Sequence, residues 1–529
     1  MNGLKLLCVF LLFTFIKGEL YTALVDLEEL LHTESVLINT LEHYIKAQEQ
    51  KLSLLKQYQK VFKSQHDKAS KDVQSYIANP INAYLLVKRL TTDWKQAETL
   101  ITTNIGNDFI ANLTAYRDYL KFPSDEDLNG AAVALTRLQD TYQLDTSSLA
   151  RGELNGVKYS SELSAADCFE LGRQSYNNGD FYHTQLWMRE ADSRLGRELN
   201  ETVQRSDILE YLAFSTFKQG NVMLALDLTN KLLEIIPTHQ RALGNKVYYE
   251  EAIQMTNVEH KKGETDADTH QEFIDEGKIL YEQLCRGDLS TPEEIVAELK
   301  CRYITNNNPY LKIGPFKVEE AYTDPKIVVF HDVMYDSEIE TIKRLAHPRF
   351  RRATVQNSMT GELETAQYRI SKSAWLKEIE HDYVAKVVQR VEAMTGLTQT
   401  TSEELQVVNY GIGGHYEPHF DFARADEKNA FKSLGTGNRI ATVLFYMSDV
   451  AQGGATVFPY IQTALWPRKG SAAFWYNLHS SGEGHKNTRH AACPVLAGSK
   501  WVSNKWIHER GQEFRRPCGF ERPPPELTA

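Results

Sequence analysis

The spacing of apolar residues changes once along this chain of 529 residues and divides it into a helical part and a β-rich part. Between residues 20 and 254, apolar side chains recur largely every three or four positions, the period of amphipathic helices. Between residues 300 and 520, short runs such as Lys326–His331 and Arg439–Met447 alternate with turn residues, which is typical of an all-β sandwich or barrel. We therefore expect a multidomain α + β protein, with the polar segment 255–275 as a linker.

The charge balance and hydropathy exclude two kinds of partner. Lys and Arg number 59 against 70 Asp and Glu, a formal net charge of −11. Phosphate binding needs a cationic face, so no nucleic-acid partner is expected. Beyond the N-terminus no stretch of 18 apolar residues occurs, so no membrane span is expected either.

The N-terminus has the pattern of a secretory signal peptide. Lys5 supplies a positive charge, Leu6–Ile16 is an apolar run, and Gly18 is a small residue at a plausible cleavage point, so residues 1–18 are expected to be removed. A buried N-terminal helix is the alternative.

The sequons at Asn112 and Asn200 are potential glycosylation sites that agree with a lumenal or secreted protein. The last residues do not match a Lys-Asp-Glu-Leu retention signal, so the protein either leaves the endoplasmic reticulum or is held there by a partner.

Residues 19–150 are predicted to form a helical N-terminal domain. Seven of nine heptad a and d positions in its first part are apolar: Leu27, Leu31, Ile38, Leu41, Ile45, Leu52 and Leu55. This stripe predicts either a coiled coil through which two chains associate or an amphipathic helix packed on its own domain. Asn79-Pro80 is expected to break the helix, and a new helical run begins at Ile81.

Residues 160–254 resemble tetratricopeptide repeats. Ala213, Gly220, Ala225 and Pro237 stand at the 8th, 15th, 20th and 32nd positions of the repeat, and Gly172 with Gly179 begins a less regular first copy. Such helical hairpins stack into an array with a concave surface.

One face of this array combines aromatic and polar residues. Tyr211, Phe214 and Phe217 share one helix face, and Arg241, Asn245 and Tyr248 share a face of the next helix. An aromatic ridge beside a polar strip suits an extended proline-rich peptide in the polyproline II conformation. The alternative is that these aromatic side chains are part of the core.

The candidate chemistry lies in the β-rich part. His419 and Asp421 are two positions apart on a predicted strand, so both side chains point to one face. Together with a distant histidine, a His-x-Asp pair forms the 2-His-1-carboxylate triad that binds Fe(II) and leaves open positions for a 2-oxo acid and O₂.

Two histidines compete for the third ligand position. In 2-oxoglutarate enzymes a basic residue follows that ligand by about ten positions, and both His490 with Lys500 and His479 with Arg489 meet this condition. His479 is followed by a loop, whereas His490 is followed by a strand, a Gly-Ser turn and the strand that begins at Lys500. We therefore predict His490 as the ligand and Lys500 as its basic partner.

Removal of the signal peptide leaves five cysteines, so at least one thiol is free or paired between chains. In an oxidising compartment the natural local pairs are Cys285 with Cys301 and Cys493 with Cys518. Cys168 remains unpaired in that scheme. The sequence alone leaves the pairing open.

Four long motifs of the β-rich part resemble the α subunit of collagen prolyl 4-hydroxylase. They are His415–Asp421, Gly453–Pro459, Thr488–Leu496 and Lys500–Trp506, and the helical part adds Asp167–Gly172 and His239–Arg241. The resemblance covers nearly the whole chain. It implies an N-terminal dimerisation domain, a tetratricopeptide-like peptide-binding domain, and a double-stranded β-helix (jelly-roll) oxygenase domain over residues 300–520, with its core at about 402–510.

The resemblance also assigns roles to residues. It implies His419, Asp421 and His490 as iron ligands and Lys500 as the partner of the far carboxylate of 2-oxoglutarate. The groove residues it implies are Tyr211, Arg241, Asn245 and Tyr248; Phe214 and Phe217 stand where better-known members carry tyrosine, and Glu210 where they carry aspartate. Candidates for the cofactor cavity or for sheet packing are Tyr410, Tyr416 and Thr442, and Trp501 and Trp506 line the substrate channel or the core.

The activity implied is hydroxylation of peptidyl proline at C4 in procollagen-type X-Pro-Gly sequences. It consumes O₂, converts 2-oxoglutarate to succinate and CO₂, and uses Fe(II) with ascorbate as a supporting reductant. The resemblance further implies an α₂β₂ assembly with protein disulfide isomerase in the endoplasmic reticulum lumen, and it agrees with the local pairs Cys285–Cys301 and Cys493–Cys518. A non-catalytic assembly subunit and a hydroxylase of non-collagen proteins are the alternatives.

Overall fold

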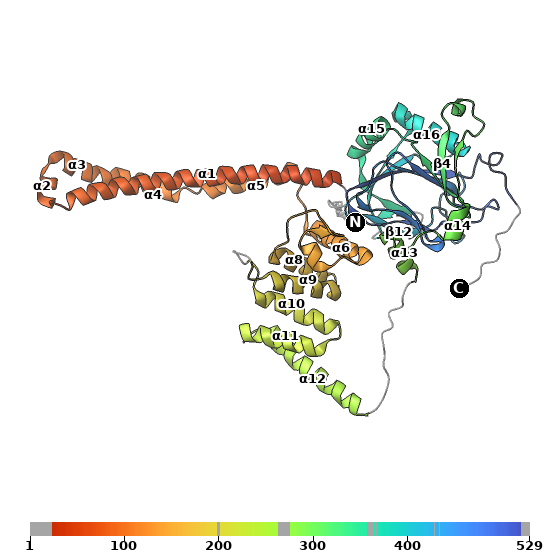
Figure 1. Ribbon diagram of the computed structural model, residues 1–529. Helices are drawn as coiled ribbons and strands as arrows, with labels where there is room; N and C mark the ends of the chain where they lie inside the picture. Colours follow the sequence, from red (N-terminus) through yellow and green to blue (C-terminus); the bar gives the residue numbers. More distant parts are fainter. Residues whose placement is uncertain are drawn as a thin grey trace, which may run out of the picture. The chain divides into compact units, whose positions relative to one another are not determined.

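The computed structural model describes residues 24–197, 202–262, 276–356, 363–365, 368–427, 429–432 and 434–519. The predicted signal peptide and the sequon at Asn200 lie outside these residues, whereas Asn112 is exposed on a helix. By its internal contacts the chain separates into a small unit, Val25–Ser124, and a large unit that begins at Asp125 (Figure 1). No helix within the described ranges is long and apolar enough to cross a membrane.

The small unit consists of one long helix and a return path of shorter ones. Its elements are α1 (Leu24–Ala69), α2 (Val73–Ala78), α3 (Pro80–Lys88), the π-helix η2 (Arg89–Asp93), α4 (Trp94–Thr102) and α5 (Ile105–Tyr119). The predicted break at Asn79-Pro80 is confirmed, because the Asn79 side chain accepts hydrogen bonds from the first turn of α3 and Pro80 opens that helix. Helices α4 and α5 run back along α1 (Figure 1).

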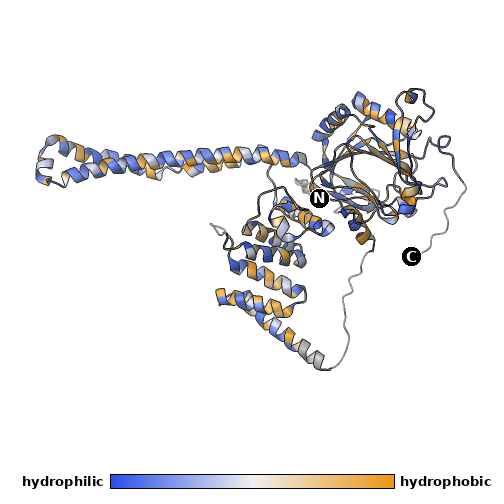
Figure 2. Cartoon of the chain, viewed as in Figure 1, coloured by the Kyte–Doolittle hydropathy of each residue, from blue (hydrophilic) through white to orange (hydrophobic). Residues whose placement is uncertain are grey.

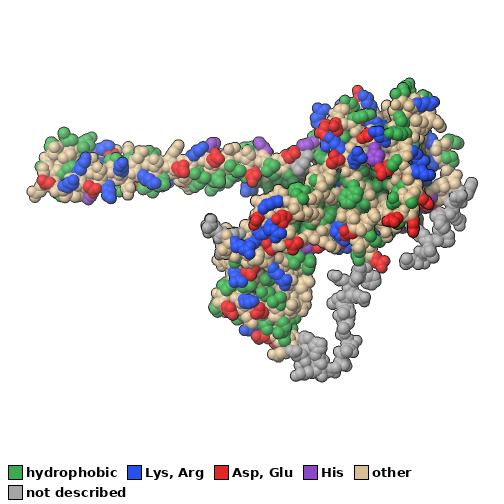
Figure 3. Space-filling model, viewed as in Figure 1, with side chains coloured by type: hydrophobic (Ala, Val, Ile, Leu, Met, Phe, Trp, Pro, Cys, Tyr) green, Lys and Arg blue, Asp and Glu red, His purple; other side chains and the backbone are tan. Residues whose placement is uncertain are grey.

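The heptad stripe of α1 is not the face that packs within the unit. The rings of Phe62 and Trp94 stack with centroids 5.1 Å apart, and Tyr44 meets Phe109 at 5.1 Å. Five of the seven stripe residues are exposed: Leu31, Ile38, Leu41, Ile45 and Leu52. Along the visible side of this unit, hydrophobic residues alternate with hydrophilic ones (Figure 2). Positively and negatively charged side chains are scattered over the same surface (Figure 3).

The small unit ends earlier than the predicted domain of residues 19–150. Helix α6 (Asp125–Tyr142) belongs to the large unit, where it contacts α8 and α13. Helix α7 (Thr146–Ala150) and the two-residue strands β1 (Glu153–Leu154) and β2 (Val157–Lys158) lead from α6 to the repeats.

The tetratricopeptide prediction is confirmed by stacked helical hairpins. They are formed by α8 (Ala165–Asn177), α9 (Phe181–Arg194), α10 (Arg205–Lys218), α11 (Val222–Ile235) and α12 (Gln240–Lys262). Gly179 and Gly220 turn the chain between helices with φ of 77° and 83°, which a residue with a Cβ rarely adopts. Helix α12 continues to Lys262, so the first part of the predicted linker 255–275 is helical, and residues 263–275 lie outside the described residues.

The remaining chain forms the predicted β-rich domain. One antiparallel sheet has nine strands in the order β3-β4-β5-β17-β13-β20-β11-β10-β6, and the other has five in the order β16-β15-β18-β12-β9. The large sheet comprises β3 (Cys301–Ile304), β4 (Phe316–Tyr322), β5 (Ile327–His331), β17 (Ala472–Tyr476), β13 (Arg439–Tyr446), β20 (Lys500–His508), β11 (Leu405–Tyr410), β10 (Lys372–Leu376) and β6 (Arg351–Arg352). The small sheet comprises β16 (Thr463–Leu465), β15 (Thr456–Phe458), β18 (His490–Ala492), β12 (His415–His419) and β9 (Arg369–Ile370).

Short elements complete this domain. Helices α13 (Glu276–Arg286) and α14 (Glu293–Glu298) precede the large sheet, α15 (Asp336–Ala346) contacts β10 and β11, and α16 (Asp382–Thr395) packs on α15. The paired strands β7 (Thr354–Gln356) with β8 (Leu363–Thr365) and β14 (Gln452–Gly453) with β19 (Val495–Ala497) lie outside the two sheets. Apolar side chains of both sheets, among them Val408, Phe458 and Trp475, fill one buried cluster.

A second buried cluster joins the repeats to the β-rich domain. It contains Leu138 of α6, Trp187 of α9, Leu284 of α13, Val457 of β15 and Ala491 of β18. The repeat helices and the strands of the small sheet therefore share one continuous core.

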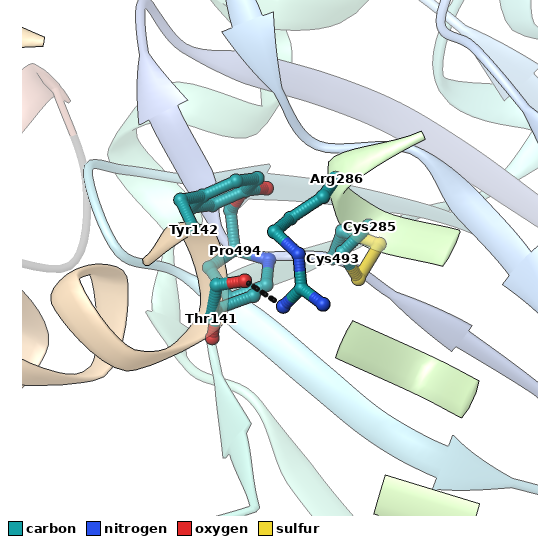
Figure 4. The surroundings of a disulfide bond; sticks show 6 residues. All are labelled: Thr141, Tyr142, Cys285, Arg286, Cys493 and Pro494. Carbon is teal, nitrogen blue, oxygen red and sulfur yellow. Dashed lines mark hydrogen bonds between the residues drawn. A yellow bond between two sulfur atoms is a disulfide. The ribbon is translucent and has the colours of Figure 1, made fainter. Parts of the chain in front are cut away.

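The predicted disulfides are wrong in their pairing. The structure joins Cys285 to Cys493, 208 residues apart, so Cys301 and Cys518 are not their partners (Figure 4). Cys285 lies near the end of α13, which packs on β15 and β16 beside the chain that leaves β18, so tertiary packing brings it to Cys493. Cys301 begins an edge strand and is exposed, and Cys518 is exposed near the C-terminus.

Two hydrogen bonds next to this disulfide attach the end of α6 to the segments that carry Cys285 and Cys493. Tyr142 donates a hydrogen bond of 2.6 Å to the carbonyl of Pro494, and Arg286 donates one of 2.9 Å to the carbonyl of Thr141 (Figure 4). Burial is the main cause that raises the pKa of the Tyr142 phenol, so it stays a donor at neutral pH.

Candidate active site

Two neighbouring strands of the small sheet bring the predicted ligands together. Strands β12 and β18 are antiparallel, and their register places His419 opposite His490. Asp421 follows the end of β12 by two residues and is buried. The ligand atoms of the three side chains lie within 4.8 Å of one another, and this is the one such group of three found among the described residues.

The geometry suits a shared metal ion. Nε2 of His419 lies 3.7 Å from Oδ1 of Asp421, and Nε2 of His490 lies 3.6 Å from Oδ2. Nδ1 of His419 is 2.8 Å from the Glu417 carbonyl, and Nδ1 of His490 is 3.0 Å from the Thr488 carbonyl. Because a carbonyl only accepts, each Nδ1 carries a proton, and Nε2 is the atom of each ring that faces the metal position.

The charge states of His419 and Asp421 are those a metal requires. Burial, aided by the neighbouring His490, lowers the pKa of His419 to about 3, so its imidazole is neutral. Burial alone would raise the pKa of Asp421, but the imidazoles of His490 and His419 with Arg439 outweigh it and lower that pKa to about 2. Thr442 donates a hydrogen bond of 2.8 Å to Oδ2 of Asp421 and orients the carboxylate. Two imidazoles and one carboxylate form the donor set that fits Fe(II).

Lys500 lines the same cavity between the two sheets. It begins β20 and is 1% exposed, and the cavity also contains His419, Asp421 and His490. Burial lowers the pKa of Lys500 to about 7, and no described carboxylate offsets this loss of hydration. A ligand that carries a carboxylate would restore the charge of the ammonium group.

The other candidates for the cavity are found in it or near it. Tyr410 and Thr442 line it, and the Lys500 ammonium lies 5.5 Å from the centre of the Tyr410 ring. Tyr416 stacks on His419 with ring centroids 3.5 Å apart. Trp506 lines the cavity, whereas Trp501 contacts Phe350 instead.

The competing histidine lies elsewhere. His479 stacks on His485 with centroids 4.0 Å apart and lines a different pocket, together with Lys486. The structure therefore brings His490, and not His479, to His419 and Asp421.

Several residues around the triad were not identified from the pattern. Phe458 and Trp475 enclose His490, with ring centroids 5.6 and 4.8 Å from it. Tyr446 donates a hydrogen bond of 2.9 Å to Thr456, which also lines the cavity. Thr456 and Phe458 belong to the motif Gly453–Pro459, so the motif contained a signal for them. Trp475 had no signal of its own within an apolar strand.

A wider pocket of about 790 Å³ opens over the triad. His419 and Asp421 lie at its inner end, since they also line the small cavity that holds Lys500. Arg439 pairs with Glu403 along its wall, with Nη2 to Oε2 at 3.0 Å, and lies 3.8 Å from the centre of the Trp506 ring.

The peptide-domain residues form one partly exposed aromatic row. Ring centroids lie 4.9 Å apart for Tyr176 and Tyr211, 6.5 Å for Phe214 and Phe217, and 5.5 Å for Phe217 and Tyr248. Arg241 is 64% exposed beside this row, and Glu210 pairs with it at 2.7 Å. Asn245 is half-buried one turn along α12.

Family models match three parts of the chain. The model described as the prolyl 4-hydroxylase alpha-subunit, N-terminal region, matches residues 23–156. The prolyl 4-hydroxylase peptide-substrate-binding domain matches residues 165–255, and the 2OG-Fe(II) oxygenase superfamily matches residues 405–508.

Known proteins are similar over almost the whole length. The chain is 50% identical over 511 residues to human prolyl 4-hydroxylase subunit alpha-1, which covers 94% of this chain and 95% of that protein. It is 49% identical over 531 residues to prolyl 4-hydroxylase subunit alpha-2 of Caenorhabditis elegans, with 98% and 97% covered. A solved viral collagen prolyl hydroxylase from Paramecium Bursaria Chlorella virus-1, in complex with 2OG, is 22% identical, with a TM-score of 0.28 over 34% of this chain and 94% of that chain. The matched domains and the extent of identity show that this chain belongs to the prolyl 4-hydroxylase alpha-subunit family.

Proposed function

We propose that this protein hydroxylates peptidyl proline at C4 in procollagen-type X-Pro-Gly sequences, coupled to the decarboxylation of 2-oxoglutarate to succinate and CO₂. The observation that carries the proposal is the triad of His419, Asp421 and His490 in one buried cavity with Lys500. Fe(II), when bound to the triad, supplies the activation of O₂ and of the 2-oxo acid. Ascorbate is proposed as the reductant that keeps the iron in its ferrous state.

The protein's own part in the reaction is to bind, orient and shelter. The Nε2 atoms of the two histidines and an ionised Asp421 would hold the metal, while Thr442 fixes the carboxylate. Lys500 binds the far carboxylate of 2-oxoglutarate through a charge-assisted contact that sets its register. The aromatic walls of Phe458 and Trp475 exclude water from this side of the triad.

The two facing sheets support assignment of the double-stranded β-helix, or jelly-roll, fold. Their inner faces enclose one cluster and one cavity, and the two histidine ligands stand on adjacent strands of the smaller sheet. Both histidines therefore rest on rigid strands, and Asp421 follows two residues after β12, where Thr442 orients its carboxylate.

The aromatic row of the repeats is proposed to bind proline-rich chain segments outside the catalytic pocket. Replacing Tyr211 by Ala is expected to raise the KM for a long (Pro-Pro-Gly) repeat peptide about tenfold, because a stacking platform at the centre of the row is lost. Peptide-free decay of 2-oxoglutarate should be unchanged. Tyr182→Ala, an exposed tyrosine of α9 that stacks on His183, is the matched control. Equal loss of both activities would instead assign Tyr211 to the core.

The exposed heptad stripe of α1 is proposed to join two α chains. Acidic side chains outnumber lysines in the first half of α1, where Asp26, Glu28, Glu29, Glu34 and Glu42 stand against Lys46. Lysines outnumber acidic side chains in the second half, where Lys51, Lys56, Lys60, Lys63 and Lys68 stand against Glu49 and Asp67. Asp26 and Glu29 pair with Lys121 of the same unit, so Glu28, Glu34 and Glu42 are the acidic residues left for a partner helix. This polarity favours an antiparallel pair, in which unlike halves meet.

Charges placed in the stripe should therefore separate the chains. A variant with Ile38→Lys and Leu41→Lys is expected to sediment at about half the mass of the parent, because two lysines would be buried in the interface. Leu54→Lys, an exposed leucine outside the stripe, is the control. An unchanged mass for the double variant would remove the stripe as the interface.

Protein disulfide isomerase is proposed as the second subunit of an α₂β₂ assembly, and the endoplasmic reticulum lumen as its location. The secretory-type N-terminus, the sequon at Asn112 and the buried disulfide Cys285–Cys493 support a lumenal protein. Retention of the chain in the lumen only when the isomerase is co-expressed would test both proposals. Secretion in its presence would contradict them.

The function is tested on protein co-expressed with protein disulfide isomerase. Fe(II), 2-oxoglutarate and ascorbate are supplied with and without a (Pro-Pro-Gly) repeat peptide, and succinate and the peptide mass are measured. Peptide-dependent succinate with one oxygen added to Y-position proline is the expected result. Succinate without peptide oxidation would reject this substrate, and iron-loaded protein without any succinate would point to a non-catalytic subunit.

A further inference from the structure

Arg489 stands next to the triad and reaches over its entrance. It directly precedes His490, and its side chain lines the wider pocket together with His419 and Asp421. Its Nη1 donates a hydrogen bond of 2.9 Å to the Tyr460 hydroxyl, and its Nε donates one of 3.3 Å to the Pro418 carbonyl. These bonds hold the guanidinium between β12, which carries His419, and the short 3-10 helix Pro459–Ile461.

Arg489 differs from the other arginines of this pocket in combining partial exposure with uncharged hydrogen-bond partners. Arg439 pairs with Glu403 and Arg424 with Glu427, while Arg369 is 5% exposed and donates to neutral oxygens in the wall. Arg489 is half-buried, and within the described ranges both of its hydrogen-bond partners are uncharged. A guanidinium has five N–H donors, so most of them remain for a ligand.

The position of Arg489 restricts which substrate residue can meet it. A proline whose C4 approaches the triad has its neighbours about 3 Å along a polyproline II chain on either side. The residue that follows the target proline in X-Pro-Gly is glycine, which has no side chain. The residue X therefore carries the one variable side chain that directly adjoins the target proline at the entrance that Arg489 lines.

From this charge and this position we infer that Arg489, held by Tyr460, selects X-Pro-Gly triplets in which X is glutamate or aspartate. The inference rests on the proposed function and deepens it by naming a substrate class. A carboxylate matches the planar guanidinium in geometry and in charge. The Tyr460 ring is 50% exposed beside it and offers an apolar surface for the methylene groups of X.

The discrimination is measured between isosteric triplets. Each host peptide contains one test triplet, Glu-Pro-Gly, Gln-Pro-Gly or Lys-Pro-Gly. All Y positions outside this triplet carry 4-hydroxyproline, so the test triplet holds the single Y-position proline of the peptide. The ratio of kcat/KM for oxygen gain between Glu and Gln peptides is expected to be about five- to tenfold for the parent enzyme, the range for a charge-assisted contact at a half-buried site. It should decrease as salt is added.

Substitutions of Arg489 show whether its guanidinium causes the preference for the Glu peptide. Arg489→Gln should bring the Glu-to-Gln ratio to about one, Arg489→Lys should keep most of it, and Arg489→Glu should favour the Lys peptide. Lys486→Gln removes one positive charge from the same turn but lies outside this pocket, and it should retain the parent ratio. The Gln peptide serves as an internal standard in every variant, because any loss of iron lowers all three rates together.

The outcomes separate the inference from the proposed function. If none of the peptides gains oxygen, the proposed function fails. If the Gln peptide is hydroxylated and the parent ratio is near one, or if Arg489→Gln keeps the parent ratio, the inference alone is overturned.

Discussion

Replacing His490 by Ala is expected to abolish peptide-dependent succinate release, with a loss greater than about 100-fold. His490 supplies one of three ligand atoms, and the remaining pair of His419 and Asp421 cannot hold Fe(II) against water and chelators. Stoichiometry of Fe(II) in the purified variant, measured next to turnover, shows whether the metal is lost with the activity.

His479→Ala is the matched control, since it removes a histidine from the same domain. His479 stacks on His485 in another pocket, so this variant should keep both iron and turnover. Loss of iron in His479→Ala together with its retention in His490→Ala would exchange the two assignments.

Replacing Lys500 by Ala is expected to raise the 2-oxoglutarate requirement by about 100-fold or more. The ammonium group is buried, and removing one partner of a buried charge pair costs about 3–5 kcal/mol. Maximal turnover at saturating 2-oxoglutarate should fall less than the apparent affinity does. The measurement is succinate release as a function of 2-oxoglutarate concentration.

Two further lysine variants make this test specific. Lys505→Met removes another buried lysine of β20, which does not line the cavity, and it should leave the 2-oxoglutarate requirement unchanged even if it lowers stability. Lys500→Arg keeps a positive charge and should recover part of the affinity. An unchanged requirement in Lys500→Ala would remove the salt-bridge assignment.

The candidate metal ligands and Lys500 could be predicted from the sequence, because local residue spacing brings them together. The His-x-Asp spacing predicted that His419 and Asp421 lie close together, which is confirmed, although β12 ends at His419 and Asp421 lies two residues beyond the strand. The choice of His490 over His479 also depended on local order, because a strand, a turn and a second strand bring Lys500 back to the ligand.

The disulfide pairing and the place of α6 could not be predicted from the sequence, because tertiary packing determines both. Cys285 and Cys301 are close in sequence, but α13 packs on the small sheet while Cys301 joins the edge of the large one. The pairing Cys285–Cys493 follows from that packing and has no local signal. Similarly, α6 continues the helical period of the N-terminal part, and nothing in that period shows that its apolar face joins the core of the repeats.

The core that the repeats share with the small sheet has a kinetic consequence. A peptide bound on the aromatic row, as proposed, would be tethered to the same unit as the catalytic pocket, so its next proline would arrive at an effective concentration set by the chain between the two sites rather than by bulk solution. Chains long enough to occupy both sites then gain avidity over short ones without any new contact at the iron. For such chains, successive triplets can be presented to the pocket before the substrate dissociates.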